Sequence, residues 1–329
     1  MALTLIGAGG RVSAQSTADT TGVIEGTVRL VTPDAAFEPT TAQLIMLREG
    51  QAPEAIEQPV ETDGHFAFEA EADPTITYLV LVEYAGIQYF SNSLLLSPEL
   101  PSLTLNFDVF AVSTTAPAMT IDSTEVTLVA IDRENSQLTL IREDFVRHDE
   151  PIVYVGGEDG VTLRLPAPDG TVDADGRDDG STGYAFEAGT VAVTIALRPG
   201  VTSVVTRYTV RYERDEDRYR LRITAPLDTD HMQIRIPERF MREVSPQSED
   251  AARAPDADFE GEPLTVIERT TPARPGQGLV VALEGLAGVE RASNPLTSRS
   301  GGAAGLVLAL IVITGLAIGL HRGLRGRTA

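Results

Sequence analysis

Hydrophobic and polar residues alternate with a period of two over most of the chain, from about residue 22 to residue 286. Such alternation places every second side chain on the same face, which predicts β-strands with one buried face. Six short strands separated by turn residues are expected in the first part of the chain, at residues 22–31, 42–48, 65–71, 78–84, 87–96 and 103–112. No convincing amphipathic helix interrupts them, and this pattern indicates a β-sandwich.

The second part of the chain shows the same pattern up to residue 286. Its expected strands lie at residues 126–132, 138–145, 152–156, 161–165, 190–196, 204–212, 218–224, 232–236, 264–270 and 279–283. So many strands indicate a larger sandwich. Residues 166–180 and 245–262 are acidic and rich in Gly or Pro, which predicts loops. The expected all-β architecture is two β-sandwich domains, at residues 22–115 and 116–286, with linkers at residues 15–21 and 287–302.

One predicted hairpin carries an unusual concentration of positive charge. The strands at residues 204–212 and 218–224 each place tyrosine and aliphatic side chains on one face and arginines on the other. As neighbours in one sheet they would share a face that contains Arg207, Arg211, Arg218, Arg220 and Arg222. Such a face is suited to binding a carboxylate or phosphate on a protein or glycan partner. The alternative is a solvated face neutralised by acidic residues of the same sheet.

Three segments of the first domain resemble a known family. They read Ile-Glu-Gly-Thr-Val at residues 24–28, Thr-Asp-Gly-His-Phe-Ala-Phe at residues 62–68 and Tyr-Leu-Val-Leu-Val at residues 78–82. Together they resemble the carboxypeptidase regulatory-like domain, a transthyretin-like sandwich. The segment at residues 84–91 is similar to a stretch of uncharacterised bacterial membrane proteins that carry this domain. The resemblance implies a non-catalytic accessory fold, of a kind also found in starch-binding modules.

The residues that carry this resemblance also fit the chemistry of strands and turns. We expect Gly26 to let the first strand twist or bulge. We expect the Asp63-Gly64 pair to supply a turn residue with a positive φ angle. Phe66 and Phe68 then point to the same face, into the core.

An uncharged apolar segment of 18 residues lies near the end of the chain, at residues 303–320. As a helix it would be about 27 Å long, which is enough to cross the hydrocarbon core of a bilayer. The expected membrane anchor comprises Leu306, Leu310, Ile313, Gly315 and Gly319, with Arg322, Arg325 and Arg327 in a basic tail at residues 321–329. Positive residues stay in the cytoplasm, so the bulk of the chain is expected outside it. The two small residues Gly315 and Gly319 also permit a homodimer through this span.

The first residues of the chain support the same topology. Residues 1–14 are mostly apolar and end in Val-Ser-Ala, which resembles the cleavage site of a secretory signal peptide. We therefore expect a single-pass protein of the cell membrane, with its β domains in the extracytoplasmic space.

Composition narrows the functions open to the chain. It contains 48 acidic and 26 basic residues, the latter all arginine, and its net charge is -22. Such a chain lacks the basic surface that nucleic-acid binding requires. The absence of Cys excludes disulfides, zinc fingers, iron–sulfur clusters and a thiol nucleophile. The histidines His65, His148 and His231 show no metal-binding or catalytic spacing, and no nucleotide-binding motif is present. We expect no catalytic activity and no cofactor.

Two further groups of residues are weaker candidates for ligand binding. Carboxylates crowd the predicted loop at Asp169, Asp173, Asp175, Asp178 and Asp179. Oxygen-rich loops bind calcium, although this spacing differs from that of an EF-hand; the alternative is a flexible acidic loop. A small aromatic platform for a sugar is the second candidate, formed by Tyr84, Tyr89 and Phe90. The alternative is that these three rings pack between the sheets.

These observations together predict a non-catalytic interaction or scaffold module of the cell envelope. The alternative is a carbohydrate-binding module at the cell surface, which the resemblance of the first domain suggests.

Overall fold

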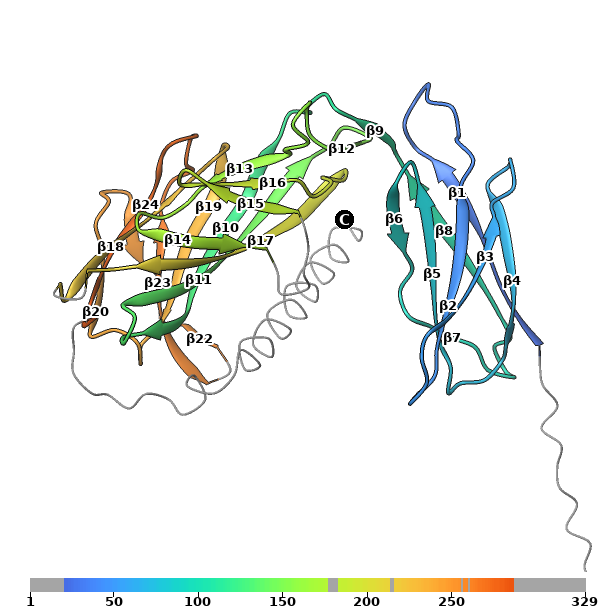
Figure 1. Ribbon diagram of the computed structural model, residues 1–329, viewed down its shortest axis with the longest axis horizontal. Helices are drawn as coiled ribbons and strands as arrows, with labels where there is room; N and C mark the ends of the chain where they lie inside the picture. Colours follow the sequence, from blue (N-terminus) through green and yellow to red (C-terminus); the bar gives the residue numbers. More distant parts are fainter. Residues whose placement is uncertain (1–20, 177–182, 214–215, 256, 260, 287–329) are drawn as a thin grey trace, which may run out of the picture. The chain divides into compact units, whose positions relative to one another are not determined.

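The computed structural model describes residues 21–176, 183–213, 216–255, 257–259 and 261–286. Throughout these residues the protein is all-β, with its strands arranged in sandwich-like sheets (Figure 1). No helix in this part of the chain is long and apolar enough to cross a membrane. The predicted signal peptide at residues 1–14 and the predicted anchor with its basic tail at residues 303–329 lie outside the described residues.

The chain divides into two compact units between Ala111 and Val112. Unit 1 denotes the described residues up to Ala111, and unit 2 denotes those from Val112 onward. Each unit has its own hydrophobic core.

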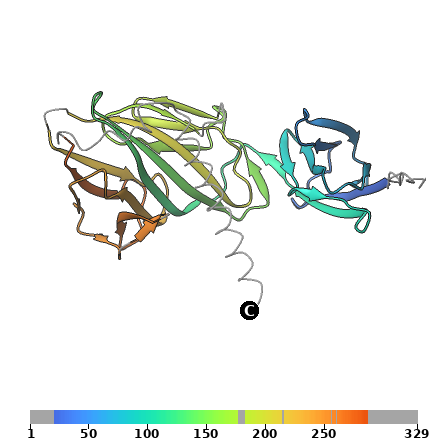
Figure 2. The same ribbon diagram turned by 90° about the horizontal axis from the view of Figure 1, so that it is seen from below.

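Unit 1 contains two sheets that enclose one core, which Figure 2 views from below. The smaller sheet has the order β4-β1-β8 and consists of β4 (His65–Glu71), β1 (Thr21–Leu30) and β8 (Ser102–Val109). The larger sheet has the order β3-β2-β5-β6 and consists of β3 (Glu54–Pro59), β2 (Thr41–Leu47), β5 (Thr77–Tyr84) and β6 (Ile87–Phe90), with β7 (Leu94–Leu95) also paired with β5. The strands β1 and β8 run parallel, and the other pairs described in unit 1 are antiparallel.

The alternation read from the sequence is present in the strands of unit 1. Phe66 and Phe68 point from β4 into the core, as predicted, and their exposed fractions are 2% and 3%. Gly64 has a φ of 87°, which confirms the positive-φ turn before β4. This sheet arrangement is compatible with the resemblance to the carboxypeptidase regulatory-like domain, which stays a prediction.

Gly26 does not form a bulge, which was one of its two expected roles. The register between β1 and β4 continues through Gly26, opposite Phe66, without a bulge. A Cβ atom at Gly26 would lie 2.4 Å from the ring of Phe66 and 2.8 Å from the carbonyl oxygen of Leu105. Glycine is required here because a phenylalanine ring packs directly over the backbone of β1.

Unit 2 is built around a sheet of eight strands. Its order is β14-β17-β11-β10-β19-β23-β21, with β14 (Thr171–Asp175), β17 (Gly200–Arg211), β11 (Gln137–His148), β10 (Thr120–Asp132), β19 (Thr229–Pro237), β23 (Glu262–Arg269) and β21 (Ala251–Arg253); β22 (Ala257–Phe259) pairs with β23. Two small sheets follow the orders β13-β16-β15 and β18-β24-β20, with β13 (Leu163–Pro166), β16 (Thr190–Val193), β15 (Tyr184–Glu187), β18 (Arg218–Thr224), β24 (Gly278–Glu284) and β20 (Glu243–Pro246). The last pair is β12 (Ile152–Tyr154) with β9 (Ala111–Ser113).

The two small sheets share one hydrophobic core with the large sheet. Leu140 of β11, Val193 of β16 and Val281 of β24 are fully buried members of this core. Figure 1 shows the two small sheets at different ends of the large one. Unit 2 is therefore a sandwich in which one layer is a continuous sheet and the opposite layer is divided in two.

The structure corrects several boundaries expected from the sequence. The predicted loop at residues 166–180 contains β14, and the predicted loop at residues 245–262 contains β21 and β22. The strands β3 and β15 were not expected at all. Most of these segments are short and polar, or lie at sheet edges, where alternation of hydrophobic residues is weak.

Candidate interaction surfaces

The larger sheet of unit 1 has an apolar outer face. Along β5 the side chains of Tyr78, Val80 and Val82 fill the core, so Leu79 and Leu81 point to the opposite side. The outer side also carries polar residues such as Gln43 and Thr77. Its apolar residues, called the apolar face below, are Ile45, Leu47, Leu79, Leu81, Phe90 and Leu95. Their side chains belong to neither hydrophobic core.

The strand register makes the apolar face continuous. Ile45 of β2 lies opposite Leu79 of β5, and Phe90 of β6 lies opposite Leu81. Directly opposite side chains on a sheet are near enough to contact each other. Phe90 and Leu95 are 58% and 54% exposed, and they are the most exposed large apolar residues in the described part of the chain. Contiguous apolar patches on a protein surface are a common feature of interaction sites.

Carboxylates lie at the border of the apolar face. Glu57 of β3 is opposite Gln43, and Glu83 of β5 is opposite Thr41 and Gln88. Both glutamates are exposed and share the outer side of the sheet. The border is therefore negatively charged.

The predicted sugar platform is not formed. Tyr84 and Tyr89 are only 2% and 7% exposed, because both point into the core of unit 1. Tyr84 stacks on Phe37 with 5.5 Å between ring centroids, and the Tyr89 hydroxyl accepts a hydrogen bond from the backbone N–H of Phe110. The expectation of three neighbouring exposed rings is corrected, since Phe90 alone of the three faces solvent.

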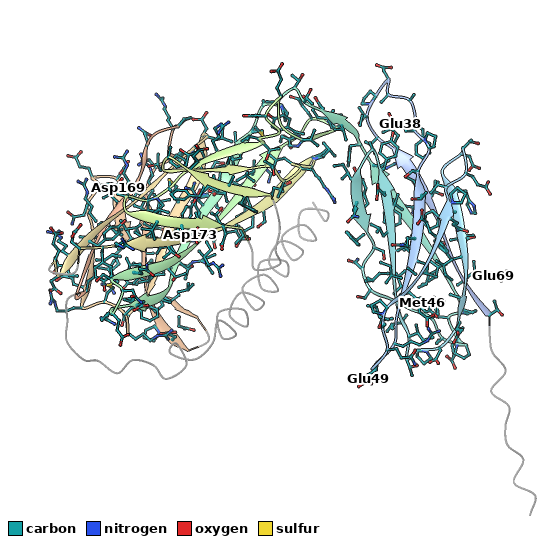
Figure 3. All side chains as sticks on the ribbon, in the orientation of Figure 1. Glu38, Met46, Glu49, Glu69, Asp169 and Asp173 are labelled. Atoms are coloured by element: carbon teal, nitrogen blue, oxygen red, sulfur yellow. The ribbon has the colours of Figure 1, made fainter. Side chains whose placement is uncertain are left out.

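An open groove of about 290 Å³ lies at one edge of unit 1. Met46 and Glu69, both labelled in Figure 3, line it together with Ile56. Arg48 lies in the groove, 3.2 Å from a carboxylate oxygen of Glu54 and 2.9 Å from one of Glu71. The only cation among the lining residues is thus already paired with carboxylates of the protein itself.

The arginines expected on one face lie on two different layers of unit 2. The strands β17 and β18 are not neighbours: β17 pairs with β11 and β14, whereas β18 pairs with β24. Tyr208 of β17 and Leu221 of β18 both belong to the core between the layers. Arg207 and Arg211 therefore point away from the large sheet, and the arginines of β18 point away from the opposite small sheet. The hairpin prediction was wrong because the chain crosses from one layer to the other after β17.

The five arginines differ in their partners. Arg207 forms an ion pair of 2.6 Å with Asp175, across from it on β14. Arg218 is 3.6 Å from Glu284, and Arg222 donates a hydrogen bond of 3.1 Å to the carbonyl oxygen of Gly276. Neither Arg211 nor Arg220 forms an ion pair or a side-chain hydrogen bond with any described residue. The sequence left open a solvated arginine face neutralised by acidic residues of the same sheet. This description fits Arg207 but not Arg220.

The described carboxylates of the predicted calcium loop lie on β14 or just before it. Asp173 and Asp175 lie on β14, and Asp175 is engaged by Arg207. Asp169, labelled with Asp173 in Figure 3, accepts a hydrogen bond at its backbone carbonyl from the hydroxyl of Tyr219. Burial, together with the charge of Asp169, raises the pKa of Tyr219 above its usual value. Asp178 and Asp179 lie outside the described residues, and no group of three metal-binding side chains occurs among the residues described. Calcium binding at this loop stays a prediction.

A buried polar cluster lies in the core of unit 2. Arg142 and Asp144 are both fully buried on the inward face of β11. The Arg142 Nε and one terminal nitrogen donate to the two carboxylate oxygens of Asp144, at 2.7 Å and 3.0 Å. Thr124 of β10 donates a third hydrogen bond of 2.6 Å to the same carboxylate. Burial acts to lower the pKa of Arg142, but the carboxylate of Asp144 and the hydroxyl of Tyr208 together outweigh it, and the pKa is raised.

Tyr208 completes this cluster from the neighbouring strand β17. Burial raises the pKa of Tyr208 to about 12, although the nearby charge of Arg142 acts in the opposite direction. This cluster was not expected from the sequence. The signal was present, since Arg142 and Asp144 occupy alternate positions in phase with Leu138, Leu140 and Val146.

Comparison with known proteins leaves the family of this chain open. No family model matches the sequence, and no curated protein matches it. Among solved structures, the chain is similar to an M1 zinc metallopeptidase from Deinococcus radiodurans, with 14% sequence identity and a TM-score of 0.29 over 51% of this chain and 42% of that one. A mutant of that peptidase bound to a Tyr-ser-ala substrate gives 13% identity and the same TM-score over 50% of this chain. The chain thus matches less than half the length of these peptidases, and a likeness this distant carries no argument about activity.

Proposed function

We propose that this protein is a non-catalytic, membrane-anchored module that binds a partner protein outside the cytoplasm through the apolar face of unit 1. The observation that supports this proposal is the row of apolar side chains on the outer side of the larger sheet, in which Phe90 and Leu95 are exposed and the others are half-buried. A sheet needs only one buried face to be stable, and the core of unit 1 already supplies it. The second apolar face is not required by the fold, so a binding role accounts for it.

The chemistry of the face indicates the chemistry of the partner. Glu57 and Glu83 give the border a negative charge, and the whole chain has a net charge of -22. Complementary charges favour association, so the partner is expected to carry an apolar patch bordered by Arg or Lys. The same charge opposes docking on anionic lipid headgroups.

The membrane anchor in this proposal is supported by the sequence. The apolar segment at residues 303–320 is long enough to span a bilayer, and the arginines after it favour a cytoplasmic end. Unit 1 and unit 2 are then held outside the cytoplasm, with residues 287–302 as the connection.

Site-specific crosslinking in native membranes tests the proposal. A photoreactive amino acid is placed at Phe90 or at Leu95 of the full chain, and in a control at Val201, a 45% exposed residue of β17 in unit 2. The first two positions are expected to crosslink the same protein, and Val201 is expected not to crosslink it. Leu95→Glu should abolish the crosslink from position 90, whereas Val201→Glu should leave it unchanged.

Four results would contradict the proposal. Crosslinks from Phe90 and Leu95 to lipid alone would exclude a protein partner. An equal yield from Val201 would show that the crosslinking is not specific to the apolar face. Turnover of an envelope substrate by the purified chain would refute the non-catalytic part, and release of the chain from membranes by alkaline carbonate would refute the anchor.

A further inference from the structure

We infer that the groove at the edge of unit 1 binds one basic side chain of another protein, a Lys or an Arg. Its aliphatic stem would lie on Met46 and Ile56, and its cationic head would pair with Glu69. The inference goes beyond the proposed function and does not depend on the apolar face. That face is on the outer side of the larger sheet, whereas Met46 and Ile56 belong to its inner side, where Ile56 lies opposite the buried Leu44.

Two edge strands border the groove. The larger sheet ends with β3 and the smaller sheet ends with β4, and each has one strand partner among the described residues. Two side-chain contacts join these edges. The side-chain amide of Gln58 donates a hydrogen bond of 2.6 Å to the carbonyl oxygen of Ala67. Arg48 bridges Glu54 of β3 and Glu71 of β4, at 3.2 Å and 2.9 Å.

The middle of this edge has no such contact. Ile56 on β3 and Glu69 on β4 are the residues midway between the two joining contacts. Ile56 is 45% exposed. Glu69 is exposed too, and its side chain forms no ion pair or hydrogen bond with any described residue. An apolar side chain and an unpaired carboxylate thus line the same opening, whose two ends are held by the protein itself.

The apolar part of the lining suits an aliphatic stem. Met46, Ile56 and Ala70 provide it. Lys and Arg bury their methylene stems along such surfaces while their charged heads stay near water. The groove measures about 290 Å³, just under the roughly 300–1,000 Å³ of small-molecule sites. Its size therefore favours a single side chain over a whole small molecule.

The charged part of the lining suits a cationic head. Three carboxylates line the groove, those of Glu54, Glu69 and Glu71, against the single cation of Arg48. Arg48 engages two of them, so the Glu69 carboxylate is left to pair with a ligand. The net charge of -22 on the whole chain also attracts basic surfaces of other proteins.

Other ligand classes fit the groove less well. An anion would be repelled by the three glutamates, and an uncharged apolar group would leave Glu69 without a partner. Among the residues that the structure describes, no group of three side chains is suited to hold a metal ion. A basic side chain uses both the apolar and the charged part of the lining.

The test uses the full 329-residue chain in non-ionic detergent, with ¹³C labels on the methionine methyl groups. Met46 lines the groove and reports binding, and Met232 and Met241 in the core of unit 2 are internal controls. The signal of Met46 is assigned by its loss in Met46→Leu. The first probe is N-acetyl-Ser-Lys-Ser-amide. In the second probe the lysine is acetylated, and in the third it is replaced by diaminopropionic acid, which keeps the ammonium but has only one methylene group.

We expect the first probe to shift the Met46 signal saturably, with a dissociation constant on the order of 1 mM, and to leave Met232 and Met241 unchanged. The second probe lacks the charge and the third lacks the stem. Each should bind at least about 5-fold more weakly than the first.

Substitutions of Glu69 test the contact with the cationic head. Glu69→Gln should weaken binding of the first probe about 2- to 5-fold, and Glu69→Lys should weaken it at least about 10-fold. Glu38→Gln is the matched control, because it removes the same charge from an exposed position that Figure 3 shows at the other end of unit 1 from Met46. It should change nothing. Unchanged thermal midpoints show that the variants are folded.

Several outcomes would overturn the inference. Equal binding of the acetylated probe would show that the groove does not recognise charge. Binding of the first probe that is unchanged by Glu69→Lys, or weakened equally by Glu38→Gln, would remove Glu69 from the site. The absence of a saturable shift of Met46 up to about 10 mM of the first probe would exclude the site itself.

Discussion

The guanidinium of Arg142 and the carboxylate of Asp144 form a two-point ion pair inside the core of unit 2, two residues apart on the inward face of β11. Both side chains are fully buried. A charge in this position requires its partner, because the surrounding core offers no water to solvate it.

Loss of one member of this pair should strongly destabilise the protein. Asp144→Ala leaves the guanidinium of Arg142 buried without its carboxylate, and we expect the free energy of unfolding to fall by about 3–5 kcal/mol. Denaturant titration of the full chain, monitored by far-UV circular dichroism, measures this change. Asp175→Ala is the control, because it breaks the solvent-accessible pair with Arg207 and should cost at most about 1 kcal/mol.

Replacing both members together should be much less harmful. In Arg142→Met with Asp144→Leu no buried charge remains, and apolar replacements of buried ion pairs are often neutral. A double variant as unstable as Asp144→Ala would contradict this account of the cluster.

Tyr208 should make the protein sensitive to alkaline pH. Its pKa is raised from the ordinary value of 10.0 to about 12, so the folded state holds the proton more tightly than the unfolded state. The resulting stability is present below pH 10 and is lost as the pH rises from about 10 to about 12. At most it amounts to about 3 kcal/mol.

Comparison with Tyr208→Phe isolates this contribution. Unfolding free energies measured at several values between pH 9 and pH 12 should fall more steeply for the parent than for the variant. Parallel curves would show that Tyr208 does not titrate differently in the folded state.

Gly26 should not tolerate a side chain while Phe66 is present. A Cβ atom would overlap the ring of Phe66, and we expect Gly26→Ala to destabilise the protein by about 1–3 kcal/mol. Gly157→Ala is a suitable control because a Cβ there meets no atom within 4 Å. Chemical denaturation of the variants gives the values.

A second substitution tests the cause. Phe66→Leu shortens the side chain above Gly26, so it should reduce the cost of Gly26→Ala when the two are combined. Additive effects would place the origin of the strain elsewhere, such as the carbonyl oxygen of Leu105.

Chelation should leave the stability of unit 2 unchanged. Asp175 is held by Arg207, and the structure brings no three carboxylates together among the residues that it describes. We expect equal thermal midpoints with EDTA and with added calcium. A midpoint raised by calcium and lowered by EDTA would instead support the calcium prediction for Asp169, Asp173 and the aspartates that follow them.

Much of the strand content could be read from alternation alone. The segments of β1, β5 and β11 alternate apolar and polar residues, and all three form strands close to the expected bounds. In contrast, β3 reads Glu-Ala-Ile-Glu-Gln-Pro, and its residues are nearly all exposed. Such an edge strand is held by backbone bonds to one neighbour, which leave no hydrophobic pattern in the sequence.

Strand pairing was harder to derive than strand position. Alternation correctly gives the inward and outward faces of β17 and β18, but it does not state which strands are adjacent. A polar connection serves equally well for a hairpin turn and for a crossing between layers. The arginines of the two strands were therefore placed on one face, although the core lies between them.

The candidate sites illustrate the same limit. Exposure of Phe90 and burial of Tyr84 and Tyr89 depend on which side of β5 faces the smaller sheet, and this is a tertiary property. The buried pair of Arg142 and Asp144 was readable in principle, since both residues occupy the inward phase of a strand. Charged residues are seldom buried, so two charged residues at inward positions of a strand are easily taken for surface residues.

The parallel pairing of β1 with β8 has a mechanical consequence. A pull applied to the start of β1 and the end of β8 acts along both strands in opposite directions, so the hydrogen bonds between them are stretched together and do not open one at a time. Unit 1 should then resist extension in single-molecule force measurements, as a load-bearing element would in a tether under tension.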